Sequence, residues 1–325
     1  MNILRSWRAC DRGAALGALL LVGSLDPVWA QPDLQVRNVV SPSSASVGQS
    51  IAIQSEIFNG GLTASLPHQL VLSLRPELAT SSGQDIVLAR ADRALLPASA
   101  SAVSTSVVIV PGTVTAGNYR VAATIDLLGG LDLDLTNNAG MSPTTLTVLI
   151  EALISLHRGL NLVALPIQPE PPRDSADFAA DVGSPYIARF VTGPDGRGRL
   201  QTQVRGLTGE VPFPLEGNRG YFVMAQSATT LAVRGRPWPR SALTVTLPAG
   251  LSAIAFPRGV PASFTTSSLV ELTGSSKVTR VVSAGSRGQL DSYVPNLTPD
   301  PVLEAGKGYI VSVGTPRALT LPEGP

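Results

Sequence analysis

The chain has 325 residues, of which 44% are hydrophobic and 14% charged, and its formal net charge is +1. A chain so close to neutrality lacks the basic surplus of proteins that bind nucleic acid or anionic membranes through charge. Its 31 glycines and 27 prolines interrupt any long helical period, while short runs rich in Val, Ile, Leu and Thr recur between turn residues. This composition predicts an all-β fold.

The first thirty residues have the order of a secretory signal. Three arginines precede a compact apolar run of 13 residues, and small residues follow at Val28 and Ala30. Spanning a bilayer takes roughly 20 residues, so we expect cleavage after Ala30 rather than a retained anchor. Cys10 precedes the apolar run instead of closing it, which argues against lipidation.

Export has consequences for the rest of the chain. Cys10 is the one cysteine, so the mature chain is expected to contain no disulfide, thiol nucleophile or thiolate metal site. No later segment reaches transmembrane length without interruption. We therefore expect a periplasmic, cell-surface or extracellular protein with no integral membrane segment once the signal is removed.

Residues 31–149 are expected to form an immunoglobulin-like β-sandwich. Alternation is clear at Leu34 and Val36, and again at Ile51, Ile53 and Ile57, where an Asn-Gly-Gly turn ends the run. Further candidate strands are "QLVLSLR", "DIVLARA", "AVSTSVVIV", "NYRVAATID" and "TTLTVLI". Seven or so short strands separated by turns within one module are typical of this sandwich.

The ordered turns of this module carry a family resemblance. The series "PDLQVRNVV", "SVGQSIAI", "FNGG", "VPGTVTAGNYRVAATID" and "LTNNAG", over residues 32–148, resembles the bacterial cell-adhesion-related domain called CARDB. The resemblance implies a sandwich on an exported protein, often in adhesion or assembly, and it implies no activity. Where the family has an acidic segment before its closing T-N-N, this chain has "LDLDLTNN".

Three aspartates in that region, Asp126, Asp132 and Asp134, raise the question of calcium. Their oxygens suit the ion, but the position where an EF-hand loop needs glycine is Asn137, so that motif fails. The alternative is a strand whose leucines face the core and whose aspartates face solvent. We favour the strand and expect no metal.

The remainder of the chain contains the same pattern twice, over residues 152–237 and 238–325. Gly159 corresponds to Gly250 and Arg189 to Arg280, each 91 positions apart. "LEGNRGYFV" corresponds to "LEAGKGYIV" at an interval of 88. Six features in the same order predict two tandem β-rich repeats. The pattern resembles the "GWNLISLP…LEPGKGYW" repeat of secreted bacterial multidomain proteins, which implies an architectural unit without assigned chemistry.

Each repeat places an acid, a base and a tyrosine at one turn: Glu216, Arg219 and Tyr221 in the first, Glu304, Lys307 and Tyr309 in the second. One interpretation is a pair of ligand sites, since aromatic rings beside charges suit carbohydrate or peptide edges. The other is a solvated ion pair and a tyrosine that caps a small core, with the preceding glycine allowing a tight entry or bulge that the ring covers. The chain has only 15 aromatic residues, which favours the second interpretation.

The residues needed for catalysis are sparse. His68 and His157 fall in different modules, and no motif of a nucleophile elbow, zinc helix or phosphate-binding loop is present. A carboxylate pair that converges in space stays open, since glycosidases need no more than that. We expect no enzymatic activity and no cofactor.

Together these patterns predict an exported, non-catalytic structural or adhesion protein that mediates protein–protein contacts. Its partner is expected to be a protein or another envelope component. The alternative is a secreted carbohydrate-binding module protein that uses the two tyrosine turns.

Overall fold

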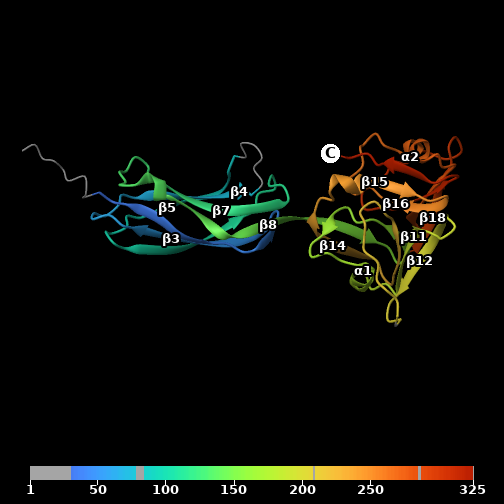
Figure 1. Ribbon diagram of the computed structural model, residues 1–325, viewed down its shortest axis with the longest axis horizontal. Coiled ribbons are helices and arrows are strands. Elements are labelled where there is room, and N and C mark those ends of the chain that lie inside the picture. The colour runs from blue at the N-terminus through green and yellow to red at the C-terminus, as the bar shows by residue number, and fades with distance from the viewer. Residues whose placement is uncertain (1–30, 78–83, 208, 285–286, 325) are drawn as a thin grey trace, which may run out of the picture.

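The computed structural model describes residues 31–77, 84–207, 209–284 and 287–324. The expected signal, residues 1–30, lies outside the described residues. Two bodies follow one another along the chain, and strand β8 (Ala139–Leu156) passes from the first into the second (Figure 1). Both bodies consist of antiparallel sheets with very little helix, so the all-β prediction is confirmed.

The first body is a sandwich of two sheets. Besides β8, its strands are β1 (Leu34–Val40), β2 (Ser44–Ser46), β3 (Ser50–Asn59), β4 (His68–Pro76), β5 (Ile86–Arg93), β6 (Ser101–Ile109) and β7 (Gly117–Asp126). One sheet has the order β1-β3-β6, and the other contains β8-β7-β4-β5 with β2 parallel to β8. Apart from the one expected around Asp132, the strands expected in this module are present, and the predicted immunoglobulin-like arrangement is confirmed.

The sandwich core follows from strand alternation. Ile51, Ile53 and Ile57 of β3 are at most 4% exposed, as their spacing predicts. They pack in one cluster with buried residues of the facing sheet, among them Leu72 of β4 and Val121 of β7. The inner faces of the two sheets therefore supply one shared core.

A tyrosine near the start of β7 fastens the loop before it. The Tyr119 hydroxyl donates to the Thr115 carbonyl oxygen at 2.8 Å, and the ring is 4% exposed. A tyrosine that bonds back to the backbone a few residues upstream is a hallmark of immunoglobulin-like sandwiches.

The strand expected around Asp132 and Asp134 is wrong. Leu131 and Leu135 are each 67% exposed, and the chain there forms a loop that ends in a 3-10 helix, Leu135–Asn137. Asp132 accepts a hydrogen bond from the Leu34 amide (2.9 Å), and Asp134 accepts one from the Thr136 amide (2.9 Å). Both carboxylates accept hydrogen bonds from backbone amides. These bonds stabilise a turn in place of the expected strand.

Strand β8 belongs to both bodies. Its first part pairs with β7 and β2 in the sandwich, and residues 150–156 pair with β14 (Thr229–Arg236) in the second body. The boundary expected between residues 149 and 152 therefore falls inside a continuous strand. The residue pattern does not reveal such a boundary, because a strand keeps the same alternation of side chains when it passes from one pairing partner to the next.

The second body contains two units with the same element order. After residues 150–156 of β8, the first unit has β9 (Gly159–Val163), β10 (Gln168–Pro169), α1 (Ser175–Asp181), β11 (Tyr186–Thr192), β12 (Gly198–Val204), β13 (Tyr221–Ala225) and β14. The second has β15 (Thr244–Leu247), β16 (Gly250–Ile254), α2 (Thr266–Thr273), β17 (Val278–Ala284), β18 (Arg287–Tyr293), β19 (Tyr309–Val313) and β20 (Arg317–Thr320). The sheets β12-β11-β13-β9 and β18-β17-β19-β16 have the same order, and β10 has no counterpart among the described residues.

The two helices were not expected and lie in what the sequence suggested were variable loops. Asp174 caps α1 by accepting from the amides of Ala176 and Asp177, and Thr265 caps α2. Helices of seven and eight residues are too short for a reliable apolar period, and their caps were the one available signal. Within the described part of the chain, no helix has the length and apolar character to cross a membrane.

Candidate functional site

The tyrosine turns, residues 215–221 and 303–309, hold the six side chains that the sequence singled out. Tyr221 and Tyr309 are both 0% exposed. Of the six candidate ligand contacts, the two tyrosine rings are therefore core residues, which agrees with the interpretation that the sequence favoured. Tyr221 stacks against Phe213 with 6.3 Å between centroids, and Tyr309 meets Phe256 edge-on at 6.0 Å.

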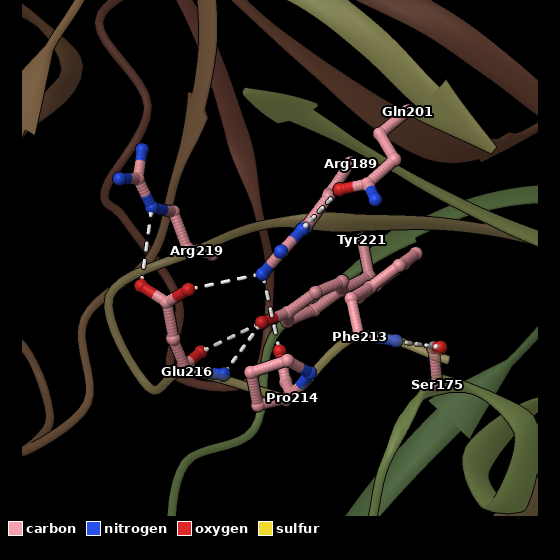
Figure 2. Close-up of polar contacts among 8 residues, drawn as sticks. All are labelled: Ser175, Arg189, Gln201, Phe213, Pro214, Glu216, Arg219 and Tyr221. Atoms are coloured by element: carbon pink, nitrogen blue, oxygen red, sulfur yellow. Dashed lines mark hydrogen bonds and ion pairs between the residues drawn. The ribbon is translucent and has the colours of Figure 1, made fainter. Parts of the chain in front are cut away.

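Each tyrosine hydroxyl closes its own turn. The Tyr221 hydroxyl accepts from the Glu216 amide at 2.6 Å and donates to the Glu216 carbonyl oxygen at 3.2 Å (Figure 2). Tyr309 makes the same pair with Glu304, at 2.6 and 3.4 Å. The hydroxyl satisfies an amide and a carbonyl that the turn itself leaves unpaired, and this fixes the tyrosine five residues after the glutamate.

Two arginines outside the tyrosine turns complete the arrangement. Arg189 of β11 donates to the Glu216 carboxylate at 2.9 Å and to the Pro214 carbonyl oxygen at 3.1 Å, and its guanidinium lies 4.3 Å from the Phe213 ring centroid (Figure 2). Arg280 of β17 approaches Glu304 at 3.5 Å. The correspondence of Arg189 with Arg280 was visible in the sequence, but their contact with the glutamates was not.

The basic residues of both turns, Arg219 and Lys307, lie beside the opposite unit. Arg219 lies 3.5 Å from the Glu216 carboxylate, which it shares with Arg189. The backbone of Arg219 bridges to Ile254 of the second unit, and that of Lys307 bridges to Val163 of the first. The tyrosine turns therefore contact the opposite unit as well as their own.

Four backbone hydrogen bonds join the two units reciprocally. They run from Gly220 N to Ala253 O (3.1 Å), from Ala255 N to Asn218 O (3.1 Å), from Gly308 N to Leu162 O (3.1 Å) and from Ala164 N to Gly306 O (3.0 Å). The first turn binds the end of β16 and the second binds the end of β9, so the second pair of bonds repeats the first with the units exchanged. Such reciprocity is what an approximate two-fold relation produces.

The glycines before the two tyrosines serve this contact. A Cβ at Gly308 would lie 2.8 Å from Leu162 Cγ and 3.1 Å from Gly220 Cα, and one at Gly220 would lie 3.3 Å from Gly308 Cα. The backbones of the two turns thus approach closely where they cross. The expected bulge covered by a ring is wrong, because what occupies the space is the other unit.

An apolar seam continues the contact between the units. Leu162, Ala253 and Val281 are buried there, and Phe190 meets Phe222 edge-on at 5.8 Å. The connection between the units is docked as well: Trp238 is 8% exposed and donates from Nε1 to the Leu165 carbonyl oxygen at 2.8 Å. The segment that connects the two units is therefore packed against the first unit, and the two units lie in close contact.

The units differ at the position of Phe213. In the first, Phe213 is 3% exposed and fills the space beside Arg189 and Tyr221. In the second, the equivalent position is Pro301, and a cleft of about 320 Å³ opens there. The cleft is lined by Thr266, Val278, Arg280, Asp291, Ser292, Tyr293, Thr298, Pro299 and Pro301.

The two buried tyrosines should make the free energy of unfolding of the second body fall at alkaline pH. Burial raises the pKa of Tyr221 to about 12 and the pKa of Tyr309 to about 12. An unfolded tyrosine ionises near pH ~10, so the folded state retains protons that the unfolded chain has lost. The free energy of unfolding should be unaffected by these groups below pH ~10 and fall as the pH rises to ~12.

Denaturation at stepped pH, followed by the fluorescence of Trp238, measures this loss. Trp238 is the one tryptophan after residue 30, so the signal reports the second body. The doubly substituted chain, Tyr221→Phe with Tyr309→Phe, should lose most of the alkaline dependence. An unchanged dependence in that variant would contradict the assignment.

Comparison with known proteins finds likeness in fold. No protein-family model and no curated protein matches the chain. The crystal structure of the CARDB domain of the PF1109 protein from Pyrococcus furiosus, with di-metal ions, is similar over 37% of this chain and 90% of that domain, at 18% identity and a TM-score of 0.29. A β-glucosidase from Listeria innocua, with glucose, is similar over 36% of this chain and 16% of the enzyme, at 13% identity and a TM-score of 0.26. These likenesses concern the fold of part of the chain, and the resemblance of the second half to a secreted repeat stays a prediction.

Proposed function

We propose that this protein is an exported, non-catalytic structural or adhesion protein that mediates protein–protein contacts at or outside the cell envelope. The observation that carries the proposal is strand β8, which pairs with β7 in the sandwich and with β14 in the second body. A continuous paired strand sets the direction of one body relative to the other, whereas a flexible linker leaves it free. The two bodies joined by β8 (Figure 1) would then present their surfaces at a fixed spacing, which suits a scaffold or an adhesin.

The use of the polar side chains supports the same proposal. Glu216 and Arg189 bind one another and the adjoining backbone, and the Tyr221 hydroxyl is committed to its own turn. These are the groups that a catalytic or ligand-binding interpretation would need. Their hydrogen bonds instead hold the tyrosine turn of their own unit in shape, and the backbone of that turn contacts the other unit. We propose that the two units arose by duplication of one unit.

The fixed spacing can be tested directly. An insertion of several Gly-Ser pairs between Leu149 and Ile150 interrupts β8 between its pairing with β2 and its pairing with β14. Small-angle scattering of residues 31–325 should show one extended shape for the natural chain and a broader distribution for the insertion. The same insertion between Glu210 and Val211, where the Val211 side chain is exposed on the second body, is the control. Equal scattering from all three chains would contradict a rigid connection.

The adhesive role needs a partner, which a binding assay can identify. The immobilised chain, residues 31–325, is exposed separately to solubilised envelope proteins, secreted proteins and insoluble polysaccharides. Saturable retention of one protein, reproduced with that protein after purification and weakened by the β8 insertion, is the expected result. Retention on nothing would contradict the adhesive role.

A second candidate function is carbohydrate binding, and the cleft of the second unit favours it. The cleft combines charged Arg280 and Asp291 with the ring of Tyr293, a mixture that suits a sugar edge. Titration calorimetry with soluble fragments of the retained polysaccharide tests it, using Asp291→Ala and, as a control, Gln201→Ala at the equivalent position of the first unit. Binding lost only in Asp291→Ala would support this function, and binding unchanged in both would exclude the cleft.

A further inference from the structure

Strand β6 is an open edge of the sandwich. It pairs with β3 on one side and is the last strand of the sheet β1-β3-β6. Val103, Val107 and Ile109 are 61%, 72% and 63% exposed on its outer face. An edge strand with exposed β-branched side chains is a template for another strand.

The direction of the backbone groups along β6 follows from its two ends. Asn59 N donates to Ala100 O at 2.9 Å, and Val110 N donates to Gln49 O at 3.0 Å. The register between these residues has no bulge, so the even-numbered residues from 100 to 110 face β3. The odd-numbered residues 101–109 therefore direct their amides and carbonyls to the open side.

The strand lacks the usual protection of an edge. Edge strands discourage pairing with charged side chains, proline or bulges. Strand β1 has Arg37 and a bulge, β5 has Arg90, Asp92 and Arg93, β12 has Arg199, and β18 has Asp291. The nine residues of β6, "SAVSTSVVI", contain no charge and no proline.

The sequence of β6 is also self-complementary. Around Thr105 it reads "VSTSV" in either direction. If two copies pair antiparallel with a two-fold axis at Thr105, Val103 of each faces Val107 of the other, and Thr105 faces Thr105. Pairs of β-branched residues and of threonines are among those that stabilise antiparallel strands. The axis residue has its amide and carbonyl on the open side, as this register requires.

We propose that the partner of this edge is a second copy of the chain, joined β6 to β6 into one continuous sheet with its two-fold axis at Thr105. Such a contact is isologous and closes on itself, so it yields a dimer and leaves no free β6 edge. The proposal is independent of the adhesive role, because it concerns self-association of the purified protein.

Sedimentation velocity of residues 31–325 over a range of concentrations tests the dimer. The natural chain should show reversible, concentration-dependent dimerisation. Thr105→Lys should raise the Kd by about tenfold or more, because it places two positive charges opposite one another at the axis. Gln54→Lys adds the same charge to β3 beside Thr105, away from the edge, and should leave the dimer intact. An equimolar mixture of Thr105→Lys and Thr105→Glu should restore association.

Cysteine crosslinking tests the register, since the sequence after residue 30 contains no cysteine. Paired residues at the axis have Cα atoms about 5.5 Å apart, within the range of a disulfide. Thr105→Cys should crosslink under mild oxidation, whereas Ser101→Cys, whose copies lie about 26 Å apart in this register, should not. A chain that stays monomeric, a dimer that survives Thr105→Lys, or equal crosslinking of both cysteine variants would overturn the proposal.

Discussion

Replacing Tyr221 or Tyr309 with alanine is expected to lower the free energy of unfolding of the second body by about 3–5 kcal/mol, the usual cost of truncating a buried aromatic residue. Both side chains are fully buried, and each hydroxyl pairs with the amide and carbonyl of one glutamate. Truncation therefore leaves a cavity in the core and two unpaired backbone groups in the turn.

Phenylalanine separates these two contributions. Tyr221→Phe and Tyr309→Phe retain the ring and remove the hydroxyl, so each should cost about 1–3 kcal/mol from the unpaired amide. Guanidinium denaturation followed by Trp238 fluorescence measures all four variants. Leu200→Ala, at a side chain that is 55% exposed, serves as the control and should change stability by no more than about 0.5 kcal/mol. Alanine variants as stable as this control would return the tyrosines to the list of candidate ligand contacts.

Gly308→Ala is expected to lower the free energy of unfolding by about 1–3 kcal/mol through overpacking at the crossing of the two turns. The added Cβ would lie 2.8 Å from Leu162 Cγ and 3.1 Å from the Gly220 backbone. Relief would require the two units to move apart, which would stretch the reciprocal hydrogen bonds that hold them. Gly308→Ala should therefore destabilise the protein by weakening the contact between the two units.

A matched control and a rescue make this prediction specific. Gly314→Ala, in the same unit, adds a Cβ that meets nothing within 4 Å and should be nearly neutral. Leu162→Ala removes the atoms that Gly308→Ala would strike, so the double variant should lose less stability than the two single changes predict together. Additive losses, or a Gly308→Ala chain as stable as Gly314→Ala, would contradict close packing at this point.

The sandwich could be predicted from sequence to a large extent, because neighbouring residues in the sequence are enough to identify each strand and its buried face. The alternation at Ile51, Ile53 and Ile57 specifies both a strand and its buried face. Prediction failed at Asp132 and Asp134, where an apparent alternation of leucine and aspartate forms a turn. A carboxylate that binds backbone amides competes with strand formation, and the residue pattern alone does not reveal which arrangement prevails.

The contacts of the candidate site could not be predicted from the sequence. The sequence by itself determined the strand pattern, the regular spacing between the two units, and the pairing of glutamate, glycine and tyrosine in each. Only the tertiary structure decided that the tyrosine rings lie inside, that Arg189 and Arg280 hold the glutamates, and that Gly220 meets Gly308. Periodicity records how a residue relates to its own strand, whereas these contacts join residues distant in sequence, and their positions depend on how the sheets pack.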